Sequence, residues 1–267
     1  MLICFEGVDC SGKSTMVNKV YDYLMAITPT PTINDPIRSI FTVKFPSHTE
    51  DSGFHVENVL QDRLINNNPF YTAMGYLTDF YSRINTDKDL IAAIKSDTDV
   101  VLFDRYYYSS LVMCSHWAKS SKSNKDSLFA FINDAINKLK LPAPDLNIVL
   151  MPRLQIVLDR VAAKKNKDSM EGLELTKKFY SNYSTACSFK AIDIFGSHGE
   201  KLPPVIINDT NFIFSFNRDD ENVKTMAEYL DPINTKTPDQ MTDEVIDVVD
   251  ALLKFKLATS VKDETTK

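Results

Sequence analysis

Residues 5–15, with the sequence FEGVDCSGKST, decide the fold of this chain. They follow a short apolar run and precede a helical pattern. Gly7 and Gly12 allow the backbone to curl so that successive N–H groups point inward and, with the N-terminus of the next helix, form a concave anion site. The chain holds only 7 glycines in 267 residues, so two of them at this spacing, followed by Lys13 and Ser14, are unexpected by chance. The stretch predicts a phosphate-binding loop (P-loop) between a strand and a helix.

The same loop supplies the residues expected to hold a nucleoside triphosphate and its metal ion. Lys13 is expected to reach the β- and γ-phosphates of ATP, and the Ser14 hydroxyl is expected to ligate Mg²⁺. ATP and Mg²⁺ are therefore the predicted cofactors. The candidate ATP-binding residues are the loop and one arginine further along the chain: Gly7, Val8, Asp9, Cys10, Ser11, Gly12, Lys13, Ser14, Thr15 and Arg160.

Composition and charge narrow the function classes. Hydrophobic residues are 43% and charged residues 25% of the chain, which is typical of a globular protein with enough apolar material for a core. The formal net charge is -6. A dedicated binder of nucleic acid or of a membrane surface needs a broad basic footprint, so we expect neither nucleic acid nor membrane as a partner.

The cysteines and the start of the chain indicate a cytoplasmic location. Cys4, Cys10, Cys114 and Cys187 show no paired spacing, so neither a zinc site nor a disulfide framework is predicted and a reducing compartment fits best. The first residues enter a strand without the basic segment of a signal peptide, and no apolar run approaches the ~20 residues needed to span a bilayer.

Apolar residues recur at strand or helix spacing along most of the chain. Helices are predicted over residues 14–25, 56–67, 69–94, 128–139, 154–163, 172–190 and 242–256, and strands over residues 2–5, 39–45, 100–103, 146–151 and 205–207. Strands that alternate with helices, without an internal repeat, predict a single α/β domain with a doubly wound parallel sheet flanked by helices, of the P-loop NTPase type. Two domains divided near residue 196 are a weaker alternative, because the last strand and helix are needed to complete the sheet.

The domain is expected to span residues 1–258. Within it, the polar segment near residues 164–171 lies between two predicted helices and is expected to form a mobile lid. Residues 209–240 are polar and interrupted by two prolines, so they are predicted to form a surface insertion. Residues 259–267 are charged and are predicted to form a flexible tail.

Asp104 and Arg105 come directly after the continuous apolar run of residues 100–103. Such a run is typical of a strand that is buried on both faces of a parallel sheet. Ligands of open α/β sheets bind outside the carboxyl ends of the strands, so this pair lies where chemistry is expected.

Several short motifs occur in an order that resembles one known family. They are FEGVD at residues 5–9, GKST at 12–15, Phe45-Pro46, Asp104-Arg105-Tyr106 with Ser109, and LPAPD at 141–145. With these motifs the chain resembles the thymidylate kinases over roughly residues 1–210 and again in its final helix. The resemblance implies an enzyme that transfers the γ-phosphate of ATP to dTMP, or to a closely related deoxypyrimidine monophosphate, in dTTP synthesis.

The resemblance also implies roles for individual residues. In that family the aspartate of the P-loop hydrogen-bonds the 3′-hydroxyl of the acceptor, and Asp9 stands at this place. The arginine of the Asp-Arg-Tyr motif holds the acceptor phosphate and its aspartate helps to organise Mg²⁺, which implies these roles for Arg105 and Asp104. The candidate catalytic residues are thus Lys13, Arg105 and Asp104, and the candidate metal ligands are Ser14 and Asp104.

On the acceptor side the chain departs twice from the family's pattern. His48 stands where the loop after the Phe-Pro pair normally supplies an arginine. A base-stacking phenylalanine and a base-reading arginine correspond to Phe80 and Arg83, although they are three residues apart rather than four. The candidate acceptor-binding residues are Asp9, Phe45, His48, Phe80, Arg83, Arg105, Tyr106 and Ser109.

A third departure concerns the cation that closes over the ATP phosphates. Neither the P-loop nor residues 168–171 contain the arginine that the family uses there. Lys164, Lys165 and Lys167 are candidate substitutes in the lid. A solvated run of charges is the alternative interpretation of this cluster.

The predicted reaction needs no general base, because an ionised phosphate oxygen of the acceptor is already a nucleophile. Catalysis would come from holding two phosphates in line and from spreading their charge over cations. A deoxynucleoside kinase, which phosphorylates a bare sugar hydroxyl, is one alternative, and a P-loop ATP-binding switch without an acceptor is another. Small-molecule nucleotides are the predicted partners, and the resemblance implies a homodimer.

Overall fold

A computed structural model describes residues 1–28, 39–47, 51–61, 68–117, 122–165, 172–186, 205–208, 212–213 and 237–264, which we call the described residues. The strands are β1 (Leu2–Glu6), β2 (Ile40–Lys44), β3 (Val100–Asp104), β4 (Leu146–Met151), β5 (Val205–Asn208) and β6 (Phe212–Ile213). The helices are α1 (Lys13–Ile27), α2 (Asp51–Gln61), α3 (Pro69–Thr86), α4 (Lys88–Lys95), α5 (Tyr107–Trp117), α6 (Lys122–Lys138), α7 (Leu154–Ala163), α8 (Leu173–Ala186) and α10 (Pro238–Glu264).

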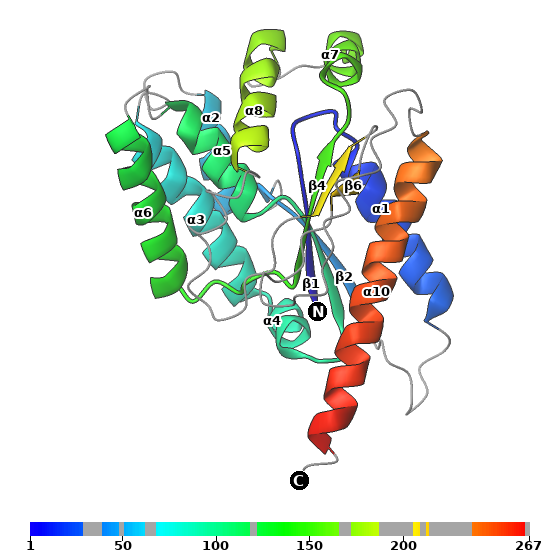
Figure 1. Cartoon of the computed structure of the whole chain (residues 1–267). Coiled ribbons are helices and arrows are strands. Elements are labelled where there is room, and N and C mark those ends of the chain that lie inside the picture. The colour runs from blue at the N-terminus through cyan, green and yellow to red at the C-terminus, as the bar shows by residue number, and fades with distance from the viewer. Residues whose placement is uncertain are drawn as a thin grey trace.

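The strands form one six-stranded sheet in the order β2-β3-β1-β4-β5-β6 (Figure 1). Neighbouring strands from β2 to β5 are parallel, and β6 pairs with β5 in the antiparallel direction. In the middle of the sheet, Ile3 of β1 lies opposite Leu102 of β3 and Leu146 of β4. All residues of β1 and β3 are buried, as expected for strands covered on both faces.

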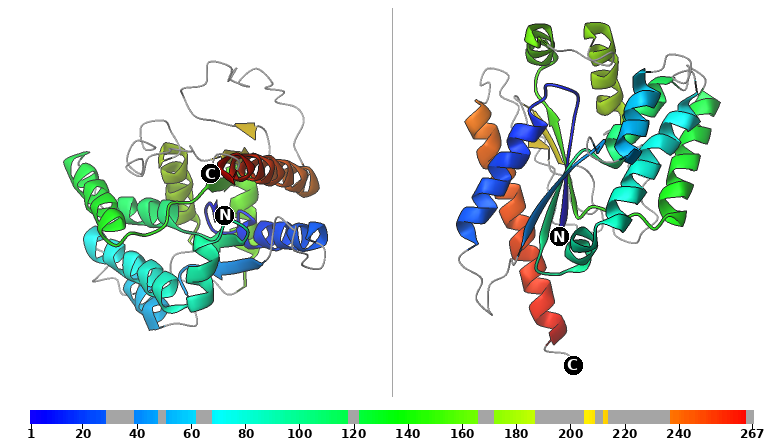
Figure 2. Two further views of the ribbon diagram at one scale, coloured as in Figure 1. Left: turned by 90° about the horizontal axis from the view of Figure 1, so that it is seen from below. Right: turned by 180° about the vertical axis from the view of Figure 1, so that it is seen from behind.

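Helices cover both faces of this sheet, so the predicted doubly wound fold is confirmed. α1 and α10 lie together on one face, and α3, α5, α6 and α8 lie on the other (Figures 1 and 2). Each face has its own apolar core. The core on the side of α1 and α10 includes Val20, Leu24, Val245 and Val249. The core on the opposite side is larger and includes Tyr76, Leu111, Ile132, Val161 and Tyr183.

The helix predicted over residues 69–94 is wrong in one respect, because the structure divides it at Asp87 into α3 and α4. Asp87 has an extended backbone, with φ -86° and ψ 107°. Its carboxylate accepts hydrogen bonds from the backbone N–H groups of Asp89 and Leu90, both at 3.1 Å. This side chain is therefore the N-cap of α4.

α5 was not predicted. Residues 106–114 are all buried, so this described part of the helix has no polar face and no amphipathic period by which it could be recognised. Other helices differ at their ends. α2 begins and ends earlier than predicted, α6 begins at Lys122, and α10 extends from Pro238 to Glu264.

α10 thus continues into residues 259–264, part of the segment predicted as a flexible tail. β6 adds a short antiparallel strand inside the predicted insertion near residues 209–240. Residues 209–211 and 214–236 of that insertion lie outside the described residues. Among the described helices, none combines the length and apolar character that a membrane span requires.

Candidate active site

Three loops that follow neighbouring strands meet at one end of the sheet. The P-loop follows β1, Arg105 follows β3, and Pro152 follows β4, and β1 lies between the other two strands. Because these strands are parallel, their carboxyl ends face the same way, which is where open α/β sheets bind ligands.

The backbone of the P-loop is curled, as its glycines predict. Gly7 and Gly12 have φ angles of 138° and 101°, which glycine adopts without the strain that other residues would suffer. A Cβ atom at Gly7 would lie 2.5 Å from the carbonyl oxygen of Leu150, so the close approach of β4 also requires glycine. Gly12 precedes α1, whose first N–H groups have no side-chain cap. These groups can therefore face an anion.

The side chain of Lys13 folds back onto the P-loop. Its side chain is only 6% exposed, and its Nζ donates a hydrogen bond of 2.7 Å to the carbonyl oxygen of Val8. Burial, and after it the nearby charge of Arg105, lowers the pKa of Lys13 to about 8, although Asp9, Asp104 and Glu6 act in the opposite direction.

Ser14 and Asp104 lie together, as the predicted metal ligands should. The Ser14 hydroxyl donates a hydrogen bond of 2.6 Å to Asp104 Oδ2. Asp104 Oδ1 is buried and has no hydrogen-bond partner among the described residues. No group of three or more His, Cys, Asp or Glu side chains in the described part of the chain could hold a metal ion unaided. Ser14 and Asp104 fit Mg²⁺, which takes few protein ligands and completes its shell with water and phosphate oxygens.

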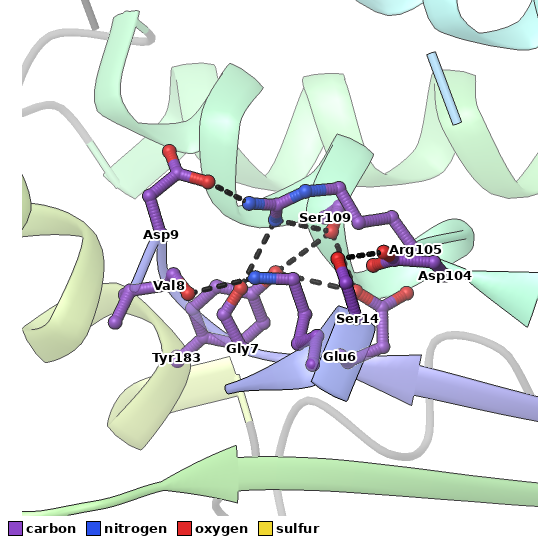
Figure 3. A network of polar contacts seen from close by, with 10 residues as sticks. Glu6, Gly7, Val8, Asp9, Ser14, Asp104, Arg105, Ser109 and Tyr183 are labelled. Atoms are coloured by element: carbon purple, nitrogen blue, oxygen red, sulfur yellow. Dashed lines mark hydrogen bonds and ion pairs between the residues drawn. The ribbon is translucent and has the colours of Figure 1, made fainter. Parts of the chain in front are cut away.

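Arg105 is turned into the P-loop. It has φ 76°, an uncommon value for a residue with a side chain. Its Nη1 donates to the carbonyl oxygen of Gly7 at 3.0 Å and to Ser109 Oγ at 3.1 Å, and its Nη2 forms an ion pair with Asp9 (Figure 3). Burial alone would raise the pKa of Asp9, but the charges of Arg105 and Lys13 outweigh it and lower that pKa.

Glu6 lies beneath this arginine and was not predicted as a site residue. It is fully buried. Its Oε1 accepts a hydrogen bond of 2.7 Å from the backbone N–H of Tyr106, and its Oε2 accepts one of 2.5 Å from Ser109 Oγ. Burial raises the pKa of Glu6, although the Ser109 hydrogen bond and the Arg105 charge oppose the rise. The signal in the sequence is a charged residue at the end of an otherwise apolar strand.

Tyr183 of α8 joins the same network and was also missed. Its hydroxyl lies 2.8 Å from Ser109 Oγ and 3.2 Å from Glu6 Oε2. Within α8 this tyrosine looks like any other apolar position of the helix, so the sequence gives no signal for its polar contacts.

On the other side of the P-loop, a cavity of about 380 Å³ opens between α1, α7 and the start of α10. Arg160 of α7 donates a hydrogen bond of 3.2 Å to the carbonyl oxygen of Cys10. The first turn of α10 contributes a wall that was not predicted. The residues that line the cavity include Cys10, Ser11, Gly12, Thr15, Arg160 and Met241.

Three predicted acceptor residues, Phe45, Phe80 and Tyr106, pack against one another. The ring centroids of Phe45 and Phe80 are 4.8 Å apart, and those of Phe80 and Tyr106 are 4.9 Å apart. Their exposed fractions are 0%, 1% and 0%, so these rings present no face to a ligand in this conformation. Their contribution to acceptor binding stays a prediction.

The remaining predicted residues lie further out. Arg83 is paired with Asp87 at 3.4 Å on α3. Lys164 and Lys165 are exposed after the end of α7, and the charge of Lys164 helps to lower the pKa of Asp9. His48 and Lys167 lie outside the described residues.

Comparisons with known proteins agree on one family. No family model matches the chain. It is 28% identical to the thymidylate kinase of Caldicellulosiruptor saccharolyticus over 183 residues, which cover 68% of this chain and 80% of that protein. It is 28% identical to the thymidylate kinase of Mesomycoplasma hyopneumoniae over 220 residues, 77% of this chain and 94% of that protein. The solved thymidylate kinase of Candida albicans matches with a TM-score of 0.57 and 17% identity, covering 94% of this chain and 91% of that chain.

The fold is that of the P-loop NTPases, with the P-loop after the first strand and with Asp104 and Arg105 at the end of the neighbouring strand β3. The likeness to the solved structure shows the fold. The chain is thus similar in sequence to curated thymidylate kinases and similar in fold to a solved one.

Proposed function

We propose that this protein transfers the γ-phosphate of ATP to dTMP, or to a closely related deoxypyrimidine monophosphate. The observation that carries the proposal is the place of Arg105, which β3 delivers to the P-loop beside Asp9. Arginine has five N–H donors in a planar fork. Three of them are used by Gly7, Ser109 and Asp9, and the other two have no partner among the described residues. Two free donors suit a bidentate contact with a phosphate.

The P-loop would bind the donor and Arg105 the acceptor, so the two phosphates would meet between β1 and β3. Lys13 would leave the carbonyl oxygen of Val8 for the transferred phosphoryl group. Ser14 and Asp104 would hold Mg²⁺, which supplies charge neutralisation at the phosphate oxygens. Since the acceptor phosphate is itself the nucleophile, the residues of this chain need only position, neutralise and exclude water.

The segment near residues 164–171 would act as the lid of this site. It joins α7, which carries Arg160, to α8, which carries Tyr183. Lys164 at its start is close enough to influence Asp9 electrostatically. A cytoplasmic location and a homodimer stay predictions that accompany this proposal.

A coupled assay for ADP tests the function. The purified protein with MgATP should form ADP rapidly with dTMP and slowly with thymidine, which lacks the phosphate that Arg105 would grip. The Lys13→Ala variant should have a kcat lower by on the order of a thousandfold, as expected for the loss of a preorganised charge contact. Faster turnover with thymidine than with dTMP would favour a deoxynucleoside kinase. ADP formation that does not depend on an acceptor would favour an ATP-driven switch.

A further inference from the structure

Tyr183 brings the hydroxyl of a distant helix to the base of the active site. The side chain is fully buried, and α8 packs against α5, which carries Ser109. The Tyr183 hydroxyl contacts Ser109 Oγ, Glu6 Oε2 and the backbone of Gly7. One phenolic oxygen therefore touches the P-loop, the end of β1 and the first turn of α5 (Figure 3).

The hydrogens of this cluster have one consistent arrangement. Ser109 has a single hydroxyl proton, and at 2.5 Å this proton is donated to the Glu6 carboxylate. In the contact of 2.8 Å between Ser109 and Tyr183, the donor must then be Tyr183, whose one hydroxyl proton is shared with Glu6 Oε2 at 3.2 Å. Burial and the Glu6 charge raise the pKa of Tyr183 well above its ordinary value, so the phenol keeps its proton. Ser109 Oγ still accepts from Arg105 Nη1 at 3.1 Å.

The orientation of Ser109 matters because Ser109 orients Arg105. The two hydrogens of Nη1 are taken by Gly7 and Ser109, and one hydrogen of Nη2 is taken by Asp9. These three contacts fix the guanidinium plane. The two remaining N–H donors of Arg105 therefore point in a fixed direction. If Ser109 rotates, Arg105 loses one of its three anchors.

We propose that Tyr183 is a positioning residue that, through Ser109 and Glu6, sets the direction in which Arg105 faces the acceptor phosphate and couples that direction to the position of α8. This inference rests on the proposed function. Since α8 carries Tyr183, a displacement of α8 would reach Arg105 through this hydroxyl.

The test compares two Tyr→Phe substitutions, each of which removes one hydroxyl. Tyr183→Phe keeps the ring and removes the contact with Ser109. Tyr23→Phe is the matched control, because the Tyr23 hydroxyl donates to Asp250 at 2.7 Å between α1 and α10, away from the acceptor side. Steady-state kinetics of the full chain should give about a tenfold lower kcat/KM for dTMP in Tyr183→Phe, as expected for one hydrogen bond to a charged network. The KM for ATP should stay within about twofold, and Tyr23→Phe should match the wild type.

Thymidine separates positioning from simple support of the fold. It lacks the phosphate, so its binding as a competitor of dTMP should be unchanged in Tyr183→Phe, whereas a loosened core would weaken both ligands alike. Ser109→Ala cuts the same connection from α5 and serves as a second variant if Tyr183→Phe is too unstable to assay. In a double-mutant cycle the effect of Tyr183→Phe should largely vanish in the Ser109→Ala background, because coupled groups are not additive.

Several outcomes would overturn the inference. They are equal losses for thymidine and dTMP, additive effects of the two substitutions, or wild-type kinetics in Tyr183→Phe. If the wild type itself does not phosphorylate dTMP, the proposed function and this inference both fail. If the wild type is active and Tyr183→Phe is unaffected, this inference alone fails.

Discussion

At the scale of single residues, Lys13 meets two opposing demands. It must be charged to hold phosphate, yet it is buried and lies near the guanidinium of Arg105, and both conditions lower its pKa, to about 8. Bound phosphates would favour the charged form of the ammonium and raise this pKa again. The free protein is therefore partly deprotonated at Lys13 in mildly alkaline solution, and the complex with ATP is not.

We predict that the binding of MgATP takes up a proton above pH 8. The sign follows from the two pKa values of Lys13: the complex binds more protons than the free protein, so affinity falls as pH rises from about 8. Titration calorimetry at pH 9 in buffers of different ionisation enthalpy should give an uptake approaching one proton, and the dissociation constant should rise by roughly twentyfold between pH 7.5 and 9.5.

Lys13→Arg is the control, because arginine stays protonated in proteins. Its affinity for MgATP will be lower, but the proton uptake should be absent. Proton uptake of similar size in Lys13→Arg would mean that the titrating group is not Lys13.

The sequence identifies residues whose role is contained in a local motif, and misses those whose role arises from distant contacts. Lys13 and Ser14 could be found because the P-loop brings them to its own phosphate site. Glu6 and Tyr183 could not, since they are 177 positions apart in the chain and meet only after the sheet and α8 have formed. Phe80, a candidate from the family resemblance, has a ring that is buried in the core, and its contact with a ligand stays a prediction.

At the scale of elements, the junction of α3 and α4 depends on one side chain. We predict that Asp87→Ala destabilises the protein by about 1–2 kcal/mol, because it removes the N-cap of α4 and the ion pair with Arg83. Asp87→Asn should lose less than about half of this, since asparagine caps as well as aspartate. Urea denaturation of the three proteins measures the difference. Equal losses in both variants would mean that the charge, and not the cap, matters at this position.

Periodicity predicted the elements that have one polar face and failed for the element that has none. α1 and α10 alternate buried and exposed residues, and both were located. In α5, residues 107–114 are all buried, so this part of the sequence carries no helical period although it holds Ser109. The break at Asp87 was missed because a single capping residue leaves the apolar spacing on either side almost unchanged.

At the scale of the whole molecule, the sheet divides the protein into two structural halves that meet at the active site. The parallel direction of the strands was predictable, because helices alternate with strands and such crossover connections have few alternatives. On one face α1 starts with Lys13, and α10 is held to it by Lys19, whose Nζ contacts Asp239 at 3.0 Å and Thr242 at 3.1 Å. On the other face α5 and α8 support Arg105 through Ser109 and Tyr183. Donor and acceptor would thus be held from opposite faces of one sheet.

This arrangement predicts two different patterns of hydrogen exchange. A ligand suppresses the local openings that break its own contacts. MgATP should therefore slow amide exchange in α1 and in the first turn of α10, which line the cavity beside the P-loop. dTMP should slow exchange in α5 and α8, because opening either helix would release Arg105. Mass spectrometry of the full chain with each ligand alone measures both patterns.

The Lys13→Ala variant should lose the protection by MgATP and keep the protection by dTMP, since its acceptor side is intact. Identical protection by the two ligands would mean that the protein opens as one unit, and the division of the site between the two faces would then be wrong.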